Sequence, residues 1–485
     1  MTEHLYDALI IGAGFGGLGA AAQLTRRGVR NFCLLEAGDE IGGVWRENTY
    51  PGAACDTQSV IYCYSYLPHL TVSRMYAGRD ELLSYLRHLA QHFALTDHLR
   101  LGTRVVRAQW DESRSRWVVT DQSGNEFHTR ALIPAWGQLG TPHVPPFDGL
   151  DTFRGTMFHS ARWDHTADLT GKRVASIGAA ASAVQYVPEI AASARQLVVF
   201  QRSANYILPR NQQVFTSAEL DTHQSDPGTF HALRERIHNE REAGFDRTRR
   251  GTDGQREGAD DAQRHLENQV ADPALRAVLT PDYDFGCKRI LRSDDYYPAL
   301  TRPNVVVETA NILRFTPDGV LVDNGEFYPL DVVVFGTGFA SQSFQGDTAI
   351  IGRDGRSLHQ RWGSTPEAYL GMLVDGFPNM FLVYGPNTNL NHNSIVAMLE
   401  VQHEFIAESV ERLCAYSELN IDVEEYAIRG YNAWLQVQLE DSAFTSECSS
   451  WYKNSEGKVI NNWCGTVEDY RRLVTARTRP EAVRS

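Results

Sequence analysis

The sequence has no long apolar run. None of its apolar stretches approaches the roughly 20 residues that a membrane-spanning helix needs. The longest, residues 9–19 and 332–339, are interrupted by glycines. The first residues carry no basic segment followed by an apolar one, which a secretory signal peptide would have. These absences predict a cytoplasmic protein that needs no membrane.

Cysteine is scarce, and its spacing matches no known motif. The seven cysteines include no CxxC pair, so zinc sites and thioredoxin-type redox centres lack their usual ligand spacing. We therefore predict no metal, and we expect these cysteines to be reduced thiols in a cytoplasmic chain. Two catalytic patterns are missing as well. There is no GxSxG serine-hydrolase motif, and His403-Glu404 is not part of a zincin motif because position 407 is alanine.

Positive charge is also in short supply. Lys and Arg total 46 against 60 Asp and Glu, which gives a net charge of −14. Such a chain needs a basic patch to bind nucleic acid, and the sequence shows none, so we expect no nucleic-acid partner. The 485 residues, 42% of them hydrophobic, suit a globular protein of about two to four domains. Nothing in the sequence requires an obligate protein partner.

The first residues predict a nucleotide-binding βαβ unit. An apolar strand at residues 6–11 leads into the segment GAGFGG, an alanine-rich helix and a second strand that ends before Glu36. Gly12, Gly14 and Gly17 match the GxGxxG pattern, whose first two glycines permit the tight turn and the approach of the pyrophosphate. A carboxylate at Glu36 would accept hydrogen bonds from ribose hydroxyls and repel a 2′-phosphate. This unit is therefore expected to hold FAD or NAD.

The same order of elements recurs in a second unit. A strand at residues 173–177, the segment GAAASA, a helix to about residue 192 and a strand at residues 197–200 follow one another. Ala180 replaces the second glycine of the pattern, and we expect its methyl group to weaken pyrophosphate binding by ~1–2 kcal/mol. Two such units predict two nucleotides, or one cofactor and a degraded second site.

The remaining segments complete the predicted fold. Residues 101–136 alternate like antiparallel strands, and residues 212–280 are charged and favour helices. The predicted fold class is α/β, with two Rossmann-like dinucleotide-binding domains and a helical subdomain inserted in the second. Further strands are expected at 305–308 and 331–335, a helix at 395–415, and a loop-rich tail after it. The predicted domains are 1–145 (first domain, first part), 146–325 (second domain, with the helical subdomain at about 212–280) and 326–485 (first domain, second part, and a C-terminal lid region).

Two segments resemble the fingerprints of a known family. Residues 42–56 read GGVWRENTYPGAACD and residues 153–164 read FRGTMFHSARWD. They resemble the GGxWxxxxYPGxxxD and FxGxxxHxxxWD fingerprints of Baeyer–Villiger monooxygenases. Chance would produce the second spacing only on the order of 10⁻³ times per chain of this composition. The resemblance extends to residues 286–300, 332–339, 384–394 and 450–463.

The resemblance implies an NADPH- and O2-dependent flavoprotein monooxygenase with a ketone-like small-molecule substrate. Its implied cofactors are FAD and NADPH. Reduced flavin and O2 would form a C4a-peroxide that inserts one oxygen next to a carbonyl, giving an ester or lactone. Asp56 and Arg289 match the family's essential carboxylate and arginine, and a fixed guanidinium would stabilise the oxyanion formed on the ketone. The alternative for this pair is a purely structural ion pair.

Other residues take roles from the same resemblance. His159 and Trp163 lie on the connection between the two domains and are assigned to a hinge. Trp451 and Lys453 match a loop over the substrate. Arg202 and Lys288 would clamp the 2′-phosphate of NADPH. The flavin-side set is Gly12, Gly14, Gly17, Glu36, Val44, Trp45, Asp56 and Tyr62, and the NADPH-side set is Gly178, Ser182, Arg202, Ser203, Lys288 and Arg289.

Two other functions stay open on the sequence. An N- or S-oxygenating flavin monooxygenase shares most of these motifs, although the Trp163-Asp164 ending and the Lys288-Arg289 pair favour the ketone. A flavin-binding protein with a degraded NADPH site is the other alternative, and Ala180 is the residue that suggests it. A disulfide reductase with two dinucleotide sites would need a redox CxxC, which the sequence lacks.

Overall fold

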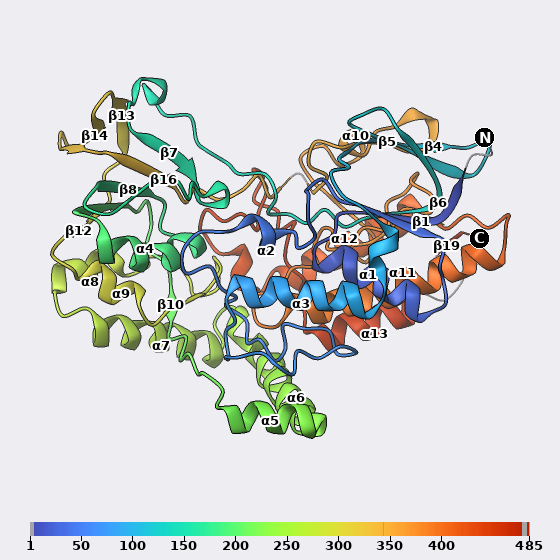
Figure 1. Cartoon of the computed structure of the whole chain (residues 1–485), viewed down its shortest axis with the longest axis horizontal. Coiled ribbons are helices and arrows are strands. Elements are labelled where there is room, and N and C mark those ends of the chain that lie inside the picture. Colours follow the sequence, from blue (N-terminus) through green and yellow to red (C-terminus); the bar gives the residue numbers. More distant parts are fainter. Residues whose placement is uncertain (1–3, 343, 478–482, 485) are drawn as a thin grey trace.

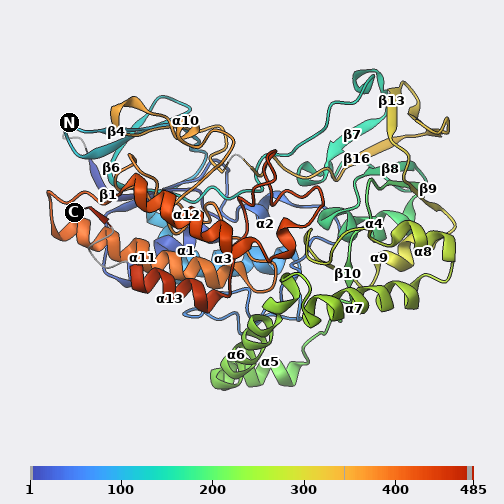
Figure 2. The same ribbon diagram turned by 180° about the vertical axis from the view of Figure 1, so that it is seen from behind.

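The computed structural model describes residues 4–342, 344–477 and 483–484. Two lobes lie side by side, each built on a sheet, and a group of helices extends below and between them (Figure 1). The blue N-terminal segments and the orange and red C-terminal segments meet in one lobe. The green and yellow middle of the chain forms the other. The same division is visible from behind (Figure 2).

The first lobe contains a seven-stranded sheet in the order β17-β4-β5-β6-β1-β2-β3. β1 runs parallel to β2 and β6, whereas β4, β5 and β6 form antiparallel pairs. This topology confirms the predicted βαβ unit and the antiparallel insertion. The strands are β1 (Leu5–Ile11), β2 (Phe32–Leu35), β3 (Leu99–Arg100), β4 (Val105–Asp111), β5 (Arg116–Asp121), β6 (Glu126–Pro134) and β17 (Ala349–Ile351).

Burial explains the composition of this lobe's centre. Residues 8–10 of β1 are fully buried, because helices and loops cover both faces of the parallel strands. Helix α1 (Phe15–Arg26) is rich in alanine and glycine, so its backbone packs closely against β1 and α11. The other helices of this part are α2 (Val44–Glu47), α3 (Arg79–His92), α10 (Leu358–Trp362) and α11 (Ile395–Ala415).

The second lobe contains a five-stranded parallel sheet in the order β12-β9-β8-β16-β7. β16 pairs with β8 and β7, so it belongs to the second unit although the predicted boundary at residue 325 placed it in the third segment. The sheet consists of β7 (Thr156–His159), β8 (Arg173–Ile177), β9 (Gln196–Phe200), β12 (Val305–Glu308) and β16 (Val332–Phe335). Around it lie α4 (Ala181–Ser193), α9 (Tyr296–Leu300) and the ribbon β13 (Ile312–Thr316), β14 (Gly319–Val322) and β15 (Phe327–Pro329).

The helical subdomain is inserted between β9 and β12, as predicted, and it touches both lobes. Phe230 and Ile237 of its second helix are buried in the core of the first lobe. Leu266 and Leu279 are buried in the core of the second lobe. The insertion therefore bridges the lobes. Its elements are β10 (Ile207–Leu208), α5 (Ser217–Ser225), α6 (Pro227–Ala243), α7 (Asp253–Gln269), α8 (Pro273–Leu279) and β11 (Leu291–Arg292).

The tail after α11 is more helical than predicted. It contains α12 (Glu425–Leu439), α13 (Val467–Arg477) and the short pair β18 (Asp422–Val423) and β19 (Val483–Arg484). Ile428 and Leu435 of α12 are fully buried. The prediction of a loop-rich tail was therefore wrong for these segments, because the apolar positions of α12 are too sparse to be recognised before their partners are known.

The expectation of seven reduced thiols was also wrong. Cys287 and Cys448, which are 161 residues apart, form a disulfide, and five cysteines remain free. No sequence spacing marks this pair, because only the folded chain brings the two segments together. Of the helices that the structure describes, none is long and apolar enough to cross a membrane.

Candidate functional site

The turn between β1 and α1 has the shape that a dinucleotide requires. Gly12 adopts φ +101°, and a Cβ added there would lie 2.7 Å from the carbonyl oxygen of Ala135. A Cβ on Gly17 would lie 1.8 Å from the Gly12 carbonyl oxygen, so only glycine allows α1 to begin this close to the turn. Gly14 is the N-cap, and no side chain caps the helix. The free N–H groups and the helix dipole therefore fit a phosphate.

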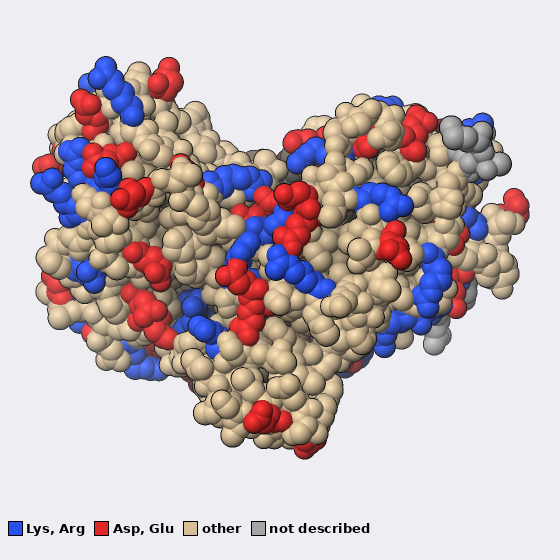
Figure 3. Space-filling view, in the orientation of Figure 1, with Lys and Arg blue, Asp and Glu red and all other residues tan. Residues whose placement is uncertain are grey.

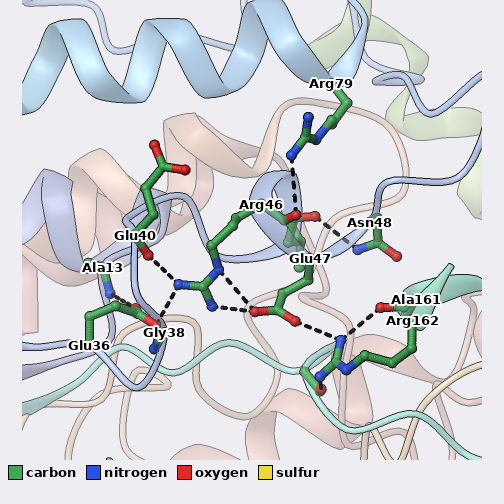
Figure 4. Close-up of polar contacts among 12 residues, drawn as sticks. Ala13, Glu36, Gly38, Glu40, Arg46, Glu47, Asn48, Arg79, Ala161 and Arg162 are labelled. Atoms are coloured by element: carbon green, nitrogen blue, oxygen red, sulfur yellow. Dashed lines mark hydrogen bonds and ion pairs between the residues drawn. The ribbon is translucent and has the colours of Figure 1, made fainter. Parts of the chain in front are cut away.

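Glu36 follows β2 and is buried. Its Oε2 accepts a hydrogen bond from the Ala13 N–H at 2.8 Å, and its Oε1 accepts from the Gly38 N–H at 2.8 Å and from Arg46 at 2.9 Å (Figure 4). A carboxylate has about four acceptor positions, so one position on Oε2 remains for a ribose hydroxyl. Glu36 thus braces the turn and fits an FAD-binding role.

An ionic chain links Glu36 to the second fingerprint (Figure 4). Arg46 pairs with both Glu36 and Glu47, and Glu47 Oε2 lies 2.6 Å from Arg162 Nη1. Arg162 lies between the predicted hinge residues His159 and Trp163. Sequence reasoning missed this chain, since the spacing of the two segments does not reveal which charged side chains meet.

The other flavin-side residues cluster beside the first turn. Val44 and Trp45 open the short helix α2, and both are partly buried. The Tyr62 ring lies edge-on to Trp45, with ring centroids 5.8 Å apart, and 5.0 Å from Phe15. Burial raises the pKa of Tyr62 well above its ordinary value, so this phenol stays neutral. The structure thus brings the predicted flavin-side set together.

Asp56 and Arg289 meet although 233 residues separate them. Arg289 Nη2 donates to Asp56 Oδ1 at 2.6 Å, and its Nε donates to Oδ2 at 3.1 Å. Burial alone would raise the pKa of Asp56, but the Arg289 charge and its hydrogen bonds outweigh it and lower the pKa. The Asp56 charge in turn raises the pKa of Arg289. Both groups are therefore charged at neutral pH, and the guanidinium is held in one orientation.

The turn before α4 repeats the first one. Gly178 adopts φ +110°, and a Cβ there would lie 2.3 Å from the Gly336 carbonyl oxygen. Ala180 is the N-cap of α4 with φ −91°, close to the −87° of Gly14. Alanine accepts this negative φ without strain, so Ala180 leaves the turn intact and only narrows the approach to the N-terminus of α4. The turn and its uncapped helix still fit a pyrophosphate.

Three predicted NADPH-side residues lie together at the end of β9. Lys288 Nζ donates to Ser203 Oγ at 2.7 Å and lies 4.3 Å from the centroid of the Tyr283 ring. Burial, and then the charge of Arg202, lower the pKa of Lys288. Two cations held close together fit the predicted 2′-phosphate clamp. Ser182 lies in the first turn of α4.

The predicted hinge residues lie at the end of β7 and just after the turn that follows it. His159 ends β7, and its Nδ1 accepts a hydrogen bond from the Ala161 N–H at 3.1 Å. Burial lowers the pKa of His159, which favours the neutral ring. The Trp163 ring centroid lies 5.0 Å from Phe158 and 5.7 Å from Tyr186 of α4. Both side chains pack within the second lobe, and no contact with Asp56 or Arg289 is seen among the described residues.

Two bridges near the site were missed from the sequence. Gln185 of α4 accepts from Tyr50 Oη at 2.9 Å and donates to the Ala54 carbonyl oxygen at 2.9 Å, which ties the second lobe to the loop before Asp56. Lys453 of the predicted lid donates to the Ser446 carbonyl oxygen at 2.6 Å, near the Cys448 disulfide. Only the position of Tyr50 in the first fingerprint hinted at the first bridge.

Comparisons with known proteins agree with this geometry. The pattern of the family described as flavin-binding monooxygenase-like matches residues 7–219. A Baeyer-Villiger monooxygenase of Streptomyces coelicolor is 38% identical over 472 residues, which cover 97% of this chain and 91% of the relative. A solved structure of an oxidized steroid monooxygenase bound to NADP gives a TM-score of 0.88 at 32% identity, with 98% and 97% of the chains covered. OTEMO in complex with FAD and NADP gives 0.87 at 26% identity, with 99% of both chains covered.

These likenesses run through nearly the full length of this chain, both lobes included. The predicted α/β fold with two dinucleotide-binding units is confirmed, as are FAD and NADPH as cofactors and the assignment to a monooxygenase. The shared architecture, the two glycine turns and the level of identity lead to one conclusion: the chain belongs to the Baeyer–Villiger monooxygenases and is an FAD- and NADPH-dependent enzyme.

Proposed function

We propose that this enzyme inserts one oxygen atom of O2 next to the carbonyl of a small ketone, with Asp56 and Arg289 as its catalytic residues. The second oxygen atom leaves as water, NADPH supplies two electrons, and the ketone becomes an ester or, if it is cyclic, a lactone. The twofold contact between Asp56 and Arg289 is the observation that supports this proposal most directly.

Each of these two side chains has a defined task. Bound FAD supplies the redox chemistry that the protein's own side chains lack. When oxygen adds to the ketone, negative charge develops on the substrate oxygen, and the Arg289 guanidinium stabilises it. At 4 Å and an effective dielectric of about 20, this attraction is worth at most ~4 kcal/mol, or about a thousandfold in rate. Asp56 holds the planar guanidinium of Arg289 in the orientation that this contact with the substrate oxygen requires.

The two lobes divide the cofactors between them. The first turn, with Glu36, Val44, Trp45 and Tyr62 nearby, holds FAD. The second turn with Ser182, together with the Arg202–Ser203–Lys288 cluster, holds NADPH. His159 and Trp163 act at the hinge between residues 1–145 and 146–325. Residues 326–485 complete the first domain and its lid, apart from β16, which pairs within the sheet of the second lobe.

A cytoplasmic location is retained in the proposal. The absence of a membrane-spanning helix among the described residues is compatible with it. The Cys287–Cys448 disulfide is unusual for that compartment, where thiols are normally kept reduced. Besides FAD and NADPH, the proposed reaction needs only a small-molecule substrate and O2.

The test is an Arg289→Ala variant, with Arg289→Lys beside it. Flavin reduction by NADPH is followed anaerobically as loss of the yellow colour, and products of ketones, amines and thioethers are identified by mass. We expect Arg289→Ala to be reduced yet to oxygenate ketones about a thousandfold more slowly. Arg289→Lys should recover only part of the rate, because an ammonium group cannot form the two parallel hydrogen bonds by which the planar guanidinium is held at Asp56.

Two results would contradict the proposal. Full ketone oxygenation by Arg289→Ala would remove its catalytic role and leave the Asp56 contact as a structural ion pair. Oxygenation of amines or thioethers alone by the unmodified enzyme would favour heteroatom oxidation, which creates no oxyanion on the substrate.

A further inference from the structure

Three more arginines gather beside the Asp56–Arg289 pair. Arg210 follows β10, Arg241 lies on α6 and Arg292 ends β11. Within the described ranges, none of these three guanidinium groups forms an ion pair with a carboxylate. We call them the arginine cluster. They come from three segments of the insertion, and each of them interacts electrostatically with Asp56.

Strand pairing brings two members of the arginine cluster together. β10 and β11 run parallel, and Arg292 is the register partner of Leu208. Arg292 Nη1 donates to the Pro209 carbonyl oxygen at 3.2 Å, which places this guanidinium beside the backbone of Arg210. The carboxylate of Asp294 accepts from the Arg210 N–H at 2.8 Å, so it fixes that backbone and leaves the guanidinium unpaired.

The Arg210 side chain holds an unused donor. Its guanidinium carbon lies 5.9 Å from the centroid of the Tyr76 ring, and its Nε is buried with no hydrogen-bond partner. A buried donor on a charged group costs free energy when it is left unpaired. This donor is therefore available to an acceptor that enters the site.

Arg241 reaches the same place from the helical subdomain. Its Nε donates to Gln58 Oε1 at 2.8 Å, and Gln58 follows Asp56 by two residues. Burial and the nearby charge of Arg292 lower the pKa of Arg241 to about 10, so it stays protonated at neutral pH. Arg210 and Arg292 also help to lower the pKa of Asp56. The four guanidinium groups therefore act on one another and on one carboxylate.

The positive charge of these four arginines is only partly neutralised. Among the described residues, the four guanidinium groups form an ion pair only with Asp56, and Arg289 already occupies both of its oxygens. The nearby Asp294 carboxylate is taken up by backbone N–H groups of residues 210–212. Like charges held together in a partly desolvated place are costly unless a counter-charge enters. A carboxylate that enters the site would supply that charge and could accept two parallel hydrogen bonds from one guanidinium.

The 2′-phosphate of NADPH has a different cluster to bind, and its pyrophosphate has the turn before α4. Lys288 interacts electrostatically with Arg202 and Asp282, and it contacts Ser203 at the end of β9. The arginine cluster instead interacts with Asp56, one of the two proposed catalytic residues. A group bound there is therefore expected to be part of the molecule that is oxygenated.

We propose that the arginine cluster binds a carboxylate carried by the substrate, so that the enzyme acts on keto acids in preference to uncharged ketones. This inference rests on the proposed ketone oxygenation and adds the substrate class. In this proposal the substrate carboxylate contacts Arg292 and Arg210, and Arg241 stays hydrogen-bonded to Gln58 beside it. The carbonyl oxygen of the ketone faces Arg289.

The test uses cyclohexanones with carboxylate side chains of increasing length, each paired with its methyl ester. We expect kcat/KM for the best acid to exceed that of its ester at least tenfold, with the advantage shrinking as salt is added. Arg292→Ser and Arg241→Gln should each reduce this acid-to-ester ratio about tenfold. Binding of the acid to the oxidised enzyme, measured without NADPH from its thermal shift, should weaken in parallel.

Arg236→Gln is the matched control. Arg236 lies on the exposed face of α6 and pairs with Glu240 at 3.0 Å, so its loss should leave the acid-to-ester ratio unchanged.

The outcomes separate this inference from the proposed function. If acid and ester are oxygenated with equal kcat/KM, the function stands and the carboxylate site is overturned. If Arg292→Ser and Arg241→Gln raise the KM for NADPH as much as that for the acid, the cluster serves the cofactor and the inference is again overturned. If NADPH reduces the flavin and neither compound is oxygenated, the proposed function fails and the inference falls with it.

Discussion

At the scale of single residues, the two glycine turns differ by one methyl group. Gly14 and Ala180 adopt nearly the same backbone angles as helix N-caps. The backbone therefore gives no reason for glycine at position 180. What the methyl group changes is the space in front of α4, where a pyrophosphate would contact the first N–H groups.

Ala180→Gly is expected to strengthen NADPH binding. Removing the methyl group should lower the Kd for NADPH about tenfold, which corresponds to ~1.4 kcal/mol. The Kd is measured from the concentration dependence of anaerobic flavin reduction. Gly430→Ala, at a position of α12 where an added Cβ meets nothing within 4 Å, is the control that leaves the Kd unchanged. An unchanged Kd in Ala180→Gly would show that the pyrophosphate does not approach this residue.

The pair Arg202 and Lys288 at the end of β9 predicts that the enzyme prefers NADPH to NADH. Arg202 and Lys288 offer two positive charges, which NADPH can use through its 2′-phosphate and NADH cannot. We expect faster flavin reduction by NADPH at equal low concentrations, and we expect Arg202→Ala to remove most of that preference. Equal rates with the unmodified enzyme would refute the clamp.

At the scale of elements, α6 connects the insertion to the first lobe. Glu242 near its C-terminus accepts hydrogen bonds from Asn393 Nδ2 at 2.6 Å and from the Glu468 N–H at 3.2 Å, and lies 3.4 Å from His392 Nε2. Burial alone would raise the pKa of Glu242, but these partners outweigh it and lower the pKa to about 2. One carboxylate thus joins α6 to the segment before α11 and to the start of α13.

This depressed pKa predicts an acid-sensitive contact. The folded pKa lies below the unfolded value of about 4.3. The stabilisation that the Glu242 carboxylate gives to the folded enzyme is therefore complete above the unfolded pKa, and it is lost as the pH falls toward 2. Glu242→Gln should lower Tm most above pH 5, and the difference from the unmodified enzyme should narrow at pH 4 and pH 3. Glu240→Gln, on the exposed face of α6, is the control. A difference that does not vary with pH would rule out this role of the Glu242 charge.

At the scale of the whole molecule, distant parts of the chain close around the site. The insertion packs into both cores, and the disulfide joins Cys287, next to Lys288 and Arg289, to Cys448 in the tail. Charged side chains of both signs are mixed over the face shown in Figure 3, which is hollowed between the lobes. The tail is thereby tied to the segment that supplies Arg289, the proposed catalytic arginine.

Cys448→Ser should lower the thermal stability of the whole enzyme. A cross-link that closes a loop of this length contributes up to ~5 kcal/mol through the unfolded chain. We expect Tm to fall by several degrees, and dithiothreitol to lower the Tm of the unmodified enzyme but not that of the variant. Cys414→Ser, at an exposed free thiol, is the control. Alkylation of the denatured, unreduced enzyme at all seven cysteines, in place of the five free ones, would contradict the disulfide.

The sequence alone determined the parts that depend on local order. Strand, glycine turn, helix and acidic residue follow one another within about thirty positions in the first unit, and the fingerprints around Asp56 and His159 are equally local. Short segments of this kind impose their own backbone geometry, so their elements could be predicted almost to the residue. The pairing of Asp56 with Arg289 came from the family resemblance and not from spacing.

The tertiary structure decided everything that depends on contacts between distant segments. The Cys287–Cys448 disulfide, the ionic chain from Glu36 to Arg162, and the arginine cluster all join residues from separate parts of the chain. Their partners are chosen by how sheets and helices pack, and no periodicity or motif in the sequence records that choice. For the same reason the substrate preference follows from the folded charges around Asp56 and not from the fingerprints.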